Sequence, residues 1–348
     1  INLFCYLMIK NLLMFNDNGR NILITGSTSG IGFYALVNLL KKENHLFIPV
    51  RSFSRGQDLK LKLRNFFKEE YLSKFLNLIY DTDFSDLNNI YKIREFIIEE
   101  KKRIDVLILN AGMQYTGGLY PKVSKQGLEL TFAINHLAHF YLTNILIPLL
   151  NSSLESRIII TSSDVHNPKS SGGNIGQKAG LNELINFKDE IQVPFKNFSA
   201  DKSYKNSKLC NILFAKELSK RLGYKQKNIS VLSWAPGLVI PDNELGFFRY
   251  SQPYNKLGYF IFSYSAKKIL GISEDIKNAG NILGDLALDK KYNDSLYTHL
   301  SNKLISFKKH KLIECETSME SNNIELSKKL WKLSEELCTS FRLRLFDL

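Results

Sequence analysis

The stretch that decides the fold reads Asn21-Ile22-Leu23-Ile24-Thr25-Gly26-Ser27-Thr28-Ser29-Gly30-Ile31-Gly32. It begins with an apolar run of the kind found in buried parallel strands, and a helical run over residues 33–42 follows the glycines. A glycine-rich turn between strand and helix lets backbone N–H groups approach a pyrophosphate at the positive end of the helix. The stretch therefore predicts a dinucleotide-binding unit, with Gly26, Ser29, Gly30, Ile31 and Gly32 as its cofactor contacts.

Strand-like and helix-like segments continue to alternate from this unit to about residue 301. The later strands are expected at residues 45–50, 76–80, 105–109, 157–161 and 229–234. This alternation predicts an α/β fold of the Rossmann type: a doubly wound parallel sheet in a single domain, with extended C-terminal helices. A linker, low-complexity run or internal repeat that would divide the chain is not evident.

We expect residues 1–20 to be an N-terminal extension outside the native fold. Residues 21–348 then form the domain, with a cofactor half at 21–155 and a catalytic and substrate half at 156–348. The first ten residues are apolar but lack a basic start and a small-residue cleavage site, which argues against a signal peptide.

The net charge of +13 favours anionic partners: phosphates, acidic lipid surfaces or nucleic acid. A solvated, lysine-rich surface is the simpler explanation, and since no nucleic-acid motif accompanies the charge we expect no nucleic-acid partner. The four cysteines are far apart and show no metal-binding spacing, so we expect a reduced, cytoplasmic protein without a metal site. No apolar run approaches the roughly 18–20 residues that span a bilayer.

The residues after the second strand indicate which dinucleotide is bound. Arg51-Ser52-Phe53-Ser54-Arg55 contains two arginines and no carboxylate. An NAD site usually has an acidic residue there for the ribose 2′-hydroxyl, whereas guanidinium groups suit a 2′-phosphate. We therefore predict NADPH, bound by Arg51 and Arg55; two ordinary surface arginines are the alternative.

Further cofactor contacts are predicted where later strands end, because ligands of such sheets bind beyond the carboxyl ends of the strands. Asp83, followed by Phe84, is placed to accept a hydrogen bond from the adenine amino group. Small residues in Asn110-Ala111-Gly112 let the chain pass close to the cofactor, and Pro236-Gly237 predicts a tight turn beneath the nicotinamide.

The chemistry is predicted on a helix over residues 200–222, which contains Tyr204-Lys205-Asn206-Ser207-Lys208. The spacing of four places the Tyr204 phenol and the Lys208 ammonium on one face. A phenol titrates near pH 10, and we expect the neighbouring cation to lower its pKa, so that the pair can exchange a proton nearer neutrality.

Two more polar residues complete the predicted catalytic set. Ser163 follows the fifth strand and can hydrogen-bond a substrate oxygen, although a turn-capping serine is the alternative. Asn135 is a candidate for holding a water that relays protons to Lys208. His136 and His139 lie three residues apart, but because further ligands are not evident we expect packing or capping roles rather than a metal site.

Taken together, these residues resemble the short-chain dehydrogenase/reductase family. The pattern is TGxxxGIG at Thr25 to Gly32, then Asn-Ala-Gly, Asn135, Ser163, Tyr204 with Lys208, and Pro-Gly. Within it the chain is most similar to the light-dependent protochlorophyllide oxidoreductases. Tyr204 to Asn211 is close to their YKDSKVCN, the insertion between Ser163 and Tyr204 is similarly long, and residues 328–337 resemble their final helix.

This resemblance implies that NADPH reduces the C17–C18 double bond of protochlorophyllide in light. Tyr204 would donate a proton to C18, Lys208 would support it, and Cys210 would contact the substrate. The chain departs from this group at Trp234-Ala235-Pro236-Gly237-Leu238, where the group has a tyrosine before Pro-Gly and a cysteine after it.

Two alternatives stay open from the sequence. Ser162-Ser163-Asp164-Val165-His166 is close to the SSxAH of retinol dehydrogenases, which would imply a light-independent reductase or dehydrogenase of a lipophilic carbonyl or alcohol. The second alternative is a module that binds NADPH or pigment but catalyses no reaction.

The aromatic stretch at residues 247–262 predicts a lid over an apolar small molecule or peripheral contact with a membrane, which the resemblance would make a photosynthetic one. A homo-oligomer is compatible with the sequence.

Overall fold

The computed structural model describes residues 19–150, 156–184, 187–192, 198–224, 229–240, 251–293 and 295–347. An eight-stranded sheet forms its centre, in the order β10-β9-β6-β5-β4-β1-β2-β3. The strands are β1 (Asn21–Ile24), β2 (His45–Pro49), β3 (Leu76–Ile79), β4 (Val106–Leu109), β5 (Ser156–Thr161), β6 (Ile229–Ala235), β9 (Tyr297–Ser306) and β10 (Lys309–Glu314). The expected strands are confirmed to within a residue or two.

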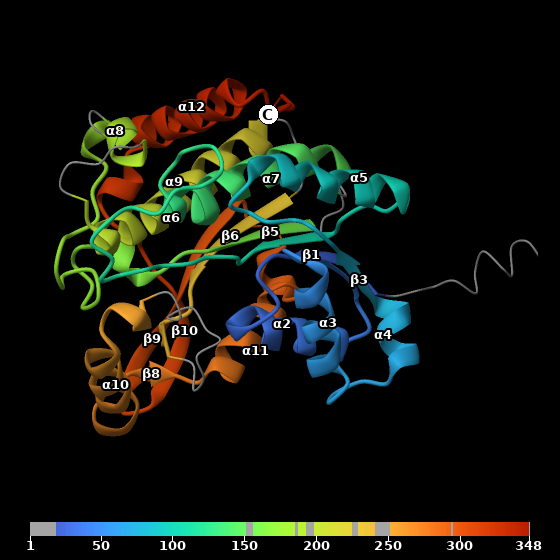
Figure 1. The fold of residues 1–348 in the computed structure, drawn as a ribbon, viewed down its shortest axis with the longest axis horizontal. Helices are drawn as coiled ribbons and strands as arrows, with labels where there is room; N and C mark the ends of the chain where they lie inside the picture. The colour runs from blue at the N-terminus through green and yellow to red at the C-terminus, as the bar shows by residue number, and fades with distance from the viewer. Residues whose placement is uncertain are drawn as a thin grey trace, which may run out of the picture.

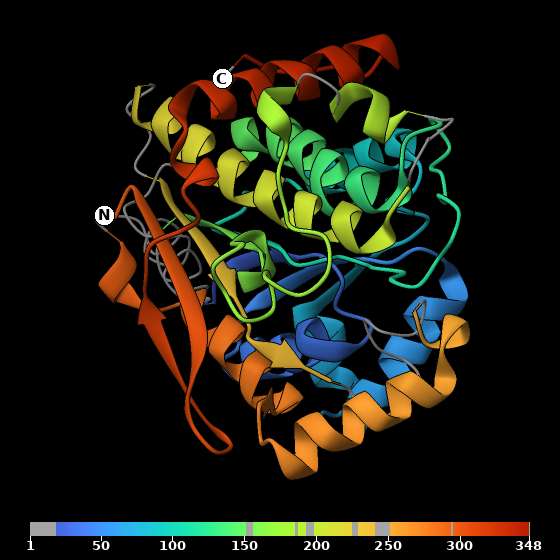
Figure 2. The ribbon, with the colours of Figure 1, turned by 90° about the vertical axis from the view of Figure 1, so that its left-hand side faces the viewer.

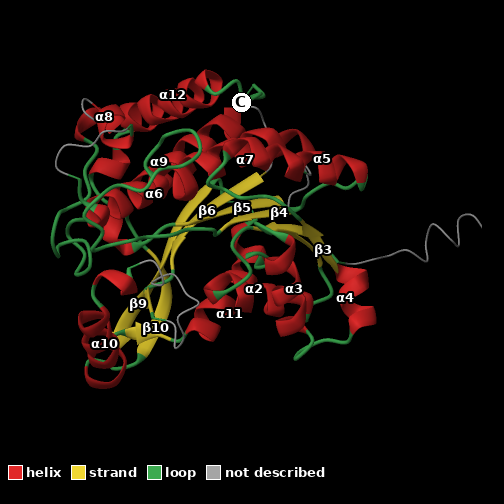
Figure 3. Cartoon of the chain, viewed as in Figure 1, coloured by secondary structure: helices red, strands yellow, loops and turns green. Residues whose placement is uncertain are grey.

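Helices cover both faces of the sheet, as Figures 1 and 3 show. One layer contains α5 (Tyr91–Glu99), α6 (Leu130–Phe132), α7 (Ala138–Leu146), α8 (Phe187–Ile191), α9 (Ala200–Tyr224) and α12 (Ile324–Ser340). The other contains α2 (Gly30–Leu40), α3 (Phe53–Leu63), α4 (Glu69–Phe75) and α11 (Ile276–Leu286). This is the predicted doubly wound α/β architecture.

The central strands β1, β4 and β5 are mainly apolar because both of their faces are buried. In β1, Leu23 packs into the core beneath α7 and α9, whereas Ile22 and Ile24 pack into the core beneath α2. Ile158 and Ile159 of β5 divide in the same way. The alternation of a strand thus supplies side chains to two separate cores at once.

The sheet differs from the prediction at one edge. β9 pairs parallel to β6, but β10 returns antiparallel to β9, so the sheet is mixed and the C-terminal part is not only helical. Near this hairpin lie α10 (Lys256–Tyr264), the π-helical turn η8 (Ser265–Ile269) and a small sheet of β7 (Leu238–Val239) and β8 (Ser273–Glu274). Figure 2 shows these elements together at one end of the molecule.

Among the described residues, one helical stretch, Leu130–Leu149, is apolar and long enough to cross a membrane. It runs through α6, the π-helical turn η2 (Ala133–Leu137) and α7, and 89% of its most apolar window is buried inside the fold. That burial is typical of a core helix. The expected extension at residues 1–20 lies almost wholly outside the described residues.

Candidate active site

A cavity of about 1230 Å³ opens where the central strands end. It brings together all but two of the predicted site residues. Those that line it are Gly26, Ser29, Gly30, Ile31, Gly32, Arg51, Arg55, Asp83, Phe84, Asn110, Ala111, Gly112, Ser163, Tyr204, Lys208, Pro236 and Gly237. The two that do not line it are Asn135 and Cys210.

The glycine turn has the shape that a bound phosphate requires. Gly26 has a φ of +71°, and a Cβ there would lie 2.7 Å from the backbone of Ala111. A Cβ on Gly32 would collide with the carbonyl oxygen of Gly26. Gly30 has a φ of +65°, and its Cβ would meet no described atom within 4 Å, because it would enter the cavity itself. The turn therefore fits the pyrophosphate of a dinucleotide at the N-terminus of α2.

Thr25, to which we assigned no role from the sequence, organises the ends of two strands. Its hydroxyl accepts from the backbone N–H groups of Asn110 (2.9 Å) and Ala111 (2.8 Å) and contacts Nε2 of His139 at 3.0 Å. The glycine turn and the Asn-Ala-Gly segment are thereby held side by side. The sequence signal for this role was a polar β-branched residue directly before the first glycine of the turn.

The two arginines line the same cavity. Ser52 caps α3, with its hydroxyl accepting from the backbone N–H of Arg55 at 3.4 Å, so that both arginines flank the helix start. Lys62 adds a third cation, since its ammonium donates to the carbonyl oxygen of Thr28 at 3.2 Å. This charge fits the 2′-phosphate of NADPH.

The adenine contacts predicted from the sequence also lie on this wall. Oδ1 of Asp83 accepts from the backbone N–H of Ser85 at 2.9 Å, which fixes the carboxylate at the rim. Phe84 is largely buried and packs edge-to-face against His139, with ring centroids 5.6 Å apart. Asp83 is thus held in place for the hydrogen bond that the sequence predicts.

The phenol, the serine and the ammonium converge at the centre of the cavity. A hydrogen bond joins the side chains of Tyr204 and Ser163. Lys208 lies one turn along α9, with Nζ 5.7 Å from the centroid of the tyrosine ring and 3.1 Å from the carbonyl oxygen of Thr161, to which it donates. Ser162, another residue missed from the sequence, ties α9 to β5 by donating to the carbonyl oxygen of Lys208 at 3.0 Å.

The expected lowering of the tyrosine pKa is wrong for this geometry. Desolvation raises the pKa of Tyr204 above its ordinary value, and the hydrogen bond with Ser163 offsets only part of that rise. Burial also lowers the pKa of Lys208 to about 8. At neutral pH the phenol therefore keeps its proton, which suits a group that donates a proton during reduction.

A pH profile tests this assignment. Because Lys208 carries its proton only below about pH 8, we expect kcat/KM for reduction to be flat below pH 8 and to fall about tenfold per unit above it. The control is Lys216, whose pKa burial also lowers to about 8 but which does not line the cavity. Lys208→Met should abolish the fall, whereas Lys216→Met should retain it; a wild-type profile that stays flat to pH 10 contradicts the assignment.

Asn135 lies behind the cavity wall. Its amide nitrogen donates to the carbonyl oxygen of Met113 and to the hydroxyl of Ser207, both at 3.0 Å, and its Oδ1 accepts from the N–H of Met113 at 2.8 Å. It sits in the π-helical turn η2, a feature frequent at functional sites. The geometry makes Asn135 a positioning residue, and its predicted water relay stays a prediction.

Cys210 does not lie where the sequence predicts. Its side chain is fully buried in the core beneath α9 and α12, and burial raises its thiol pKa well above the usual range. The reason is rotation, because two residues beyond Lys208 the helix faces away from the cavity. The predicted substrate contact is therefore wrong.

His136 and His139 are buried and held by different partners. His136 contacts Ser334 of α12 at 3.0 Å, and Nδ1 of His139 contacts the carbonyl oxygen of Asn135 at 3.0 Å. Burial lowers the pKa of His136 to about 3 and that of His139 to about 4, so both are neutral. Of the packing or capping roles that the sequence predicts, the structure shows packing for both histidines.

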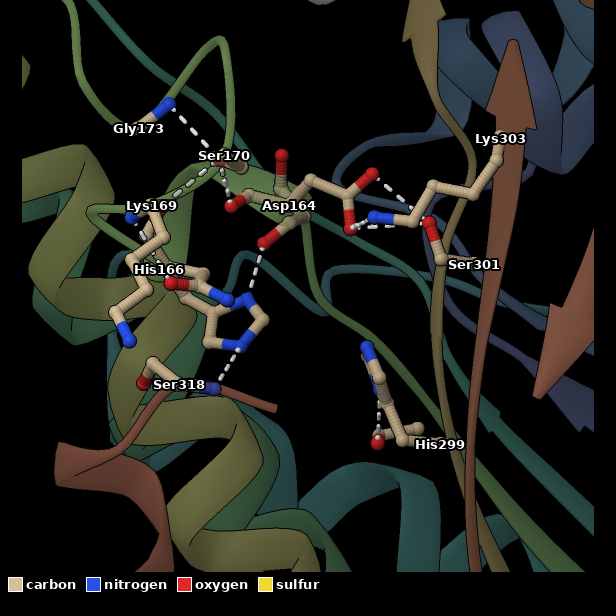
Figure 4. Close-up of polar contacts among 12 residues, drawn as sticks. Asp164, His166, Lys169, Ser170, Gly173, His299, Ser301, Lys303 and Ser318 are labelled. Atoms are coloured by element: carbon tan, nitrogen blue, oxygen red, sulfur yellow. Dashed lines mark hydrogen bonds and ion pairs between the residues drawn. The ribbon is translucent and has the colours of Figure 1, made fainter. Parts of the chain in front are cut away.

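A polar clamp beside Ser163 holds the substrate end of the cavity, and Figure 4 shows its side chains. Asp164 accepts from the hydroxyl of Ser301 at 2.8 and 2.9 Å and pairs with the ammonium of Lys303 at 3.0 Å. On the other side, His166 contacts the carbonyl oxygen of Ser163 at 2.7 Å and accepts from the N–H of Ser318 at 3.2 Å. The turn that carries Ser163 is thus fixed to β9 and to the segment before α12.

Loosening this clamp should impair catalysis without releasing the cofactor. We expect Asp164→Asn to lower kcat about tenfold, since losing the ion pair and part of its hydrogen bonding costs about 1–2 kcal/mol and lets Ser163 shift. The dissociation constant of NADPH should stay unchanged. The control is Asp285→Asn, which removes an exposed ion pair with Lys42. Equal effects of the two variants on kcat would refute this role of Asp164.

Apolar side chains form part of the remaining wall of the cavity. Leu238, Tyr259, Phe262 and Ile272 lie there, so part of the predicted aromatic lid does border the site. Residues 247–250 of that lid lie outside the described residues. Leu238 occupies the position of the expected cysteine, whereas Ala235 is fully buried and does not line the cavity. The space beyond Ser163, Tyr204 and Lys208, which we call the catalytic trio, therefore suits an apolar substrate.

Comparisons with known proteins agree with this geometry. The family model for short chain dehydrogenases matches residues 20–184. The chloroplastic protochlorophyllide reductase of Daucus carota is 26% identical over 328 residues, covering 91% of this chain and 77% of that protein. Human retinol dehydrogenase 14 is 33% identical over 230 residues, covering 64% and 62%. A crystal structure of an uncharacterized protein from Mycobacterium paratuberculosis superposes with a TM-score of 0.63 at 21% identity, covering 94% and 95% of the two chains.

Proposed function

Because the chain belongs to the short-chain dehydrogenase/reductase family of oxidoreductases, we propose that it uses NADPH to reduce an apolar substrate of the protochlorophyllide type. One observation carries the proposal: Ser163, Tyr204 and Lys208 meet in the same cavity as the glycine turn and the two arginines. The match to the protochlorophyllide reductase of Daucus carota extends over 91% of the chain, which supports this substrate class.

In this proposal the cofactor is NADPH, which supplies a hydride to C17 when bound. Tyr204 gives its phenolic proton to C18, so that one hydride and one proton saturate the double bond. Ser163 holds the phenol through their hydrogen bond. Lys208, anchored on the carbonyl oxygen of Thr161, stabilises the resulting phenolate, because an adjacent cation favours the charged form.

The experiment uses purified protein, NADPH and protochlorophyllide, with absorbance spectra recorded before and after illumination. We expect the pigment spectrum to change to that of the reduced product in light and to stay constant in darkness. An unchanged spectrum after illumination, with NADPH shown to be bound, would refute the pigment substrate.

A second candidate is a light-independent reductase of a lipophilic carbonyl, like the retinol dehydrogenases. Leu238 in place of the expected cysteine favours it, as does the 33% identity to retinol dehydrogenase 14. Turnover of retinaldehyde with NADPH in darkness would select this candidate. In either case the proposal places the protein at a membrane surface, where such substrates concentrate: a photosynthetic membrane for the pigment.

A further inference from the structure

The helix α10 presents an apolar face to solvent. Leu257, Phe260, Ile261 and Tyr264 recur at the spacing i, i+3, i+4, i+7, which places them on one face. They are 71%, 66%, 56% and 55% exposed. A face with this spacing normally packs against a core, yet no residue of α10 is buried. The opposite side of the helix contributes Tyr259 to the cavity.

The β9–β10 hairpin extends this face. Leu304, Ile305 and Phe307 near its turn are also exposed. The hairpin lies against the end of η8, because the N–H of Lys308 donates to the carbonyl oxygen of Gly271 at 2.9 Å. Figures 1 and 2 both show α10 and the hairpin at the same end of the molecule. We call the four apolar residues of α10 and these three residues the apolar end patch.

The two described segments that form the patch carry charges of one sign. Residues 251–272 and 303–313 contain no aspartate or glutamate. They contain seven lysines: Lys303, which belongs to the clamp in the cavity, and Lys256, Lys267, Lys268, Lys308, Lys309 and Lys311. Exposed aromatic and aliphatic side chains suit the acyl boundary of a bilayer, and the lysines around them suit the phosphates of anionic lipids. A second protein chain would need acidic residues facing these lysines.

We propose that the apolar end patch is the surface by which this protein docks on an anionic membrane. Gly258 and Phe262 of α10 and Leu304 of the hairpin line the cavity as well. The docked membrane therefore faces the mouth of the site, and an apolar substrate passes from the bilayer to the catalytic trio without crossing water. This route of entry rests on the proposed function, whereas docking itself does not.

The test is flotation of the full chain with vesicles of phosphatidylcholine alone or of equal parts phosphatidylcholine and phosphatidylglycerol. We expect binding to the second kind, reversed by salt. Ile261→Ser should weaken it about tenfold, because the variant no longer buries the isoleucine side chain at the acyl boundary. Its control is Ile324→Ser, a similar exposed position (59% against 56%) on α12.

Charge reversal gives a second matched pair. Lys308→Glu with Lys309→Glu should weaken binding at least tenfold, because two cations that attract anionic lipid are replaced by anions. Lys101→Glu with Lys102→Glu is the control, because it also alters two adjacent exposed lysines of which the first has a positive φ (51° against 56°).

Three results would overturn the proposal: no binding to the anionic vesicles, equal loss in patch and control variants, or a wild-type dimer in solution that Ile261→Ser dissociates. Vesicle binding without turnover of either substrate would instead refute the proposed function and leave the docking surface standing.

Discussion

Tyr204→Phe should lower turnover by roughly 10²- to 10⁴-fold, the contribution typical of a positioned general acid. The substitution removes only the hydroxyl that hydrogen-bonds Ser163, while the ring that lies near Lys208 remains. We therefore expect the dissociation constant of NADPH and the melting temperature to stay close to wild type. The measurement is steady-state kinetics together with NADPH titration.

The matched control is Tyr34→Phe. Tyr34 lies on α2, packs against Phe33 and Gly280, and does not line the cavity. Its variant should keep full activity. A Tyr204→Phe protein that turns over like this control would show that the proton comes from elsewhere, and a protein that only binds NADPH or pigment would be equally unaffected by both changes.

The double variant Arg51→Ala with Arg55→Ala should raise the dissociation constant of NADPH by roughly 10²- to 10³-fold. Each charge-assisted hydrogen bond to the 2′-phosphate contributes about 1.5–3 kcal/mol. Affinity for NADH, which lacks that phosphate, should stay within about twofold of wild type, since the glycine turn and Asp83 are untouched. Titration of both dinucleotides by calorimetry measures the difference.

Arg64→Ala is the control for this pair. Arg64 lies directly after α3, and its guanidinium pairs with Glu69 at 2.9 Å outside the cavity. It should leave both affinities unchanged. If the double variant lost NADPH and NADH equally, the arginines would be general structural supports and the preference for NADPH would have to come from another group.

Much of the fold followed from local sequence signals. A strand buried on both faces reads as a continuous apolar run, so β1, β4 and β5 were recognisable from sequence alone. The glycine turn was equally plain, because only glycine accommodates the positive φ of Gly26 with the Ala111 backbone 2.7 Å from its missing Cβ. The β9–β10 hairpin was not predicted, since Lys303 and His310 interrupt the apolar alternation where the strands reach the cavity rim.

The site was harder to predict because its energetics depend on burial. Spacing placed Tyr204 and Lys208 on one face of α9, but it could not show that desolvation outweighs the hydrogen bond with Ser163 and raises the phenol pKa. The clamp of Asp164, Ser301 and Lys303 joins residues 137 and 139 positions apart, which no local pattern encodes. The substrate contact predicted for Cys210 came from the resemblance of this segment to YKDSKVCN. Two residues beyond Lys208, a helix already faces away from the cavity, so the prediction was wrong.

Single-turnover transfer of deuterium tests the central claim most directly. The protein is mixed with NADPH that carries deuterium at both C4 positions and with protochlorophyllide in light or retinaldehyde in darkness, and the product is analysed by mass spectrometry. The account predicts one deuterium in the product of one of these substrates for each NADPH oxidised, and a rate of transfer roughly 10²- to 10⁴-fold lower with Tyr204→Phe. Bound NADPH that transfers no deuterium to either substrate would contradict it.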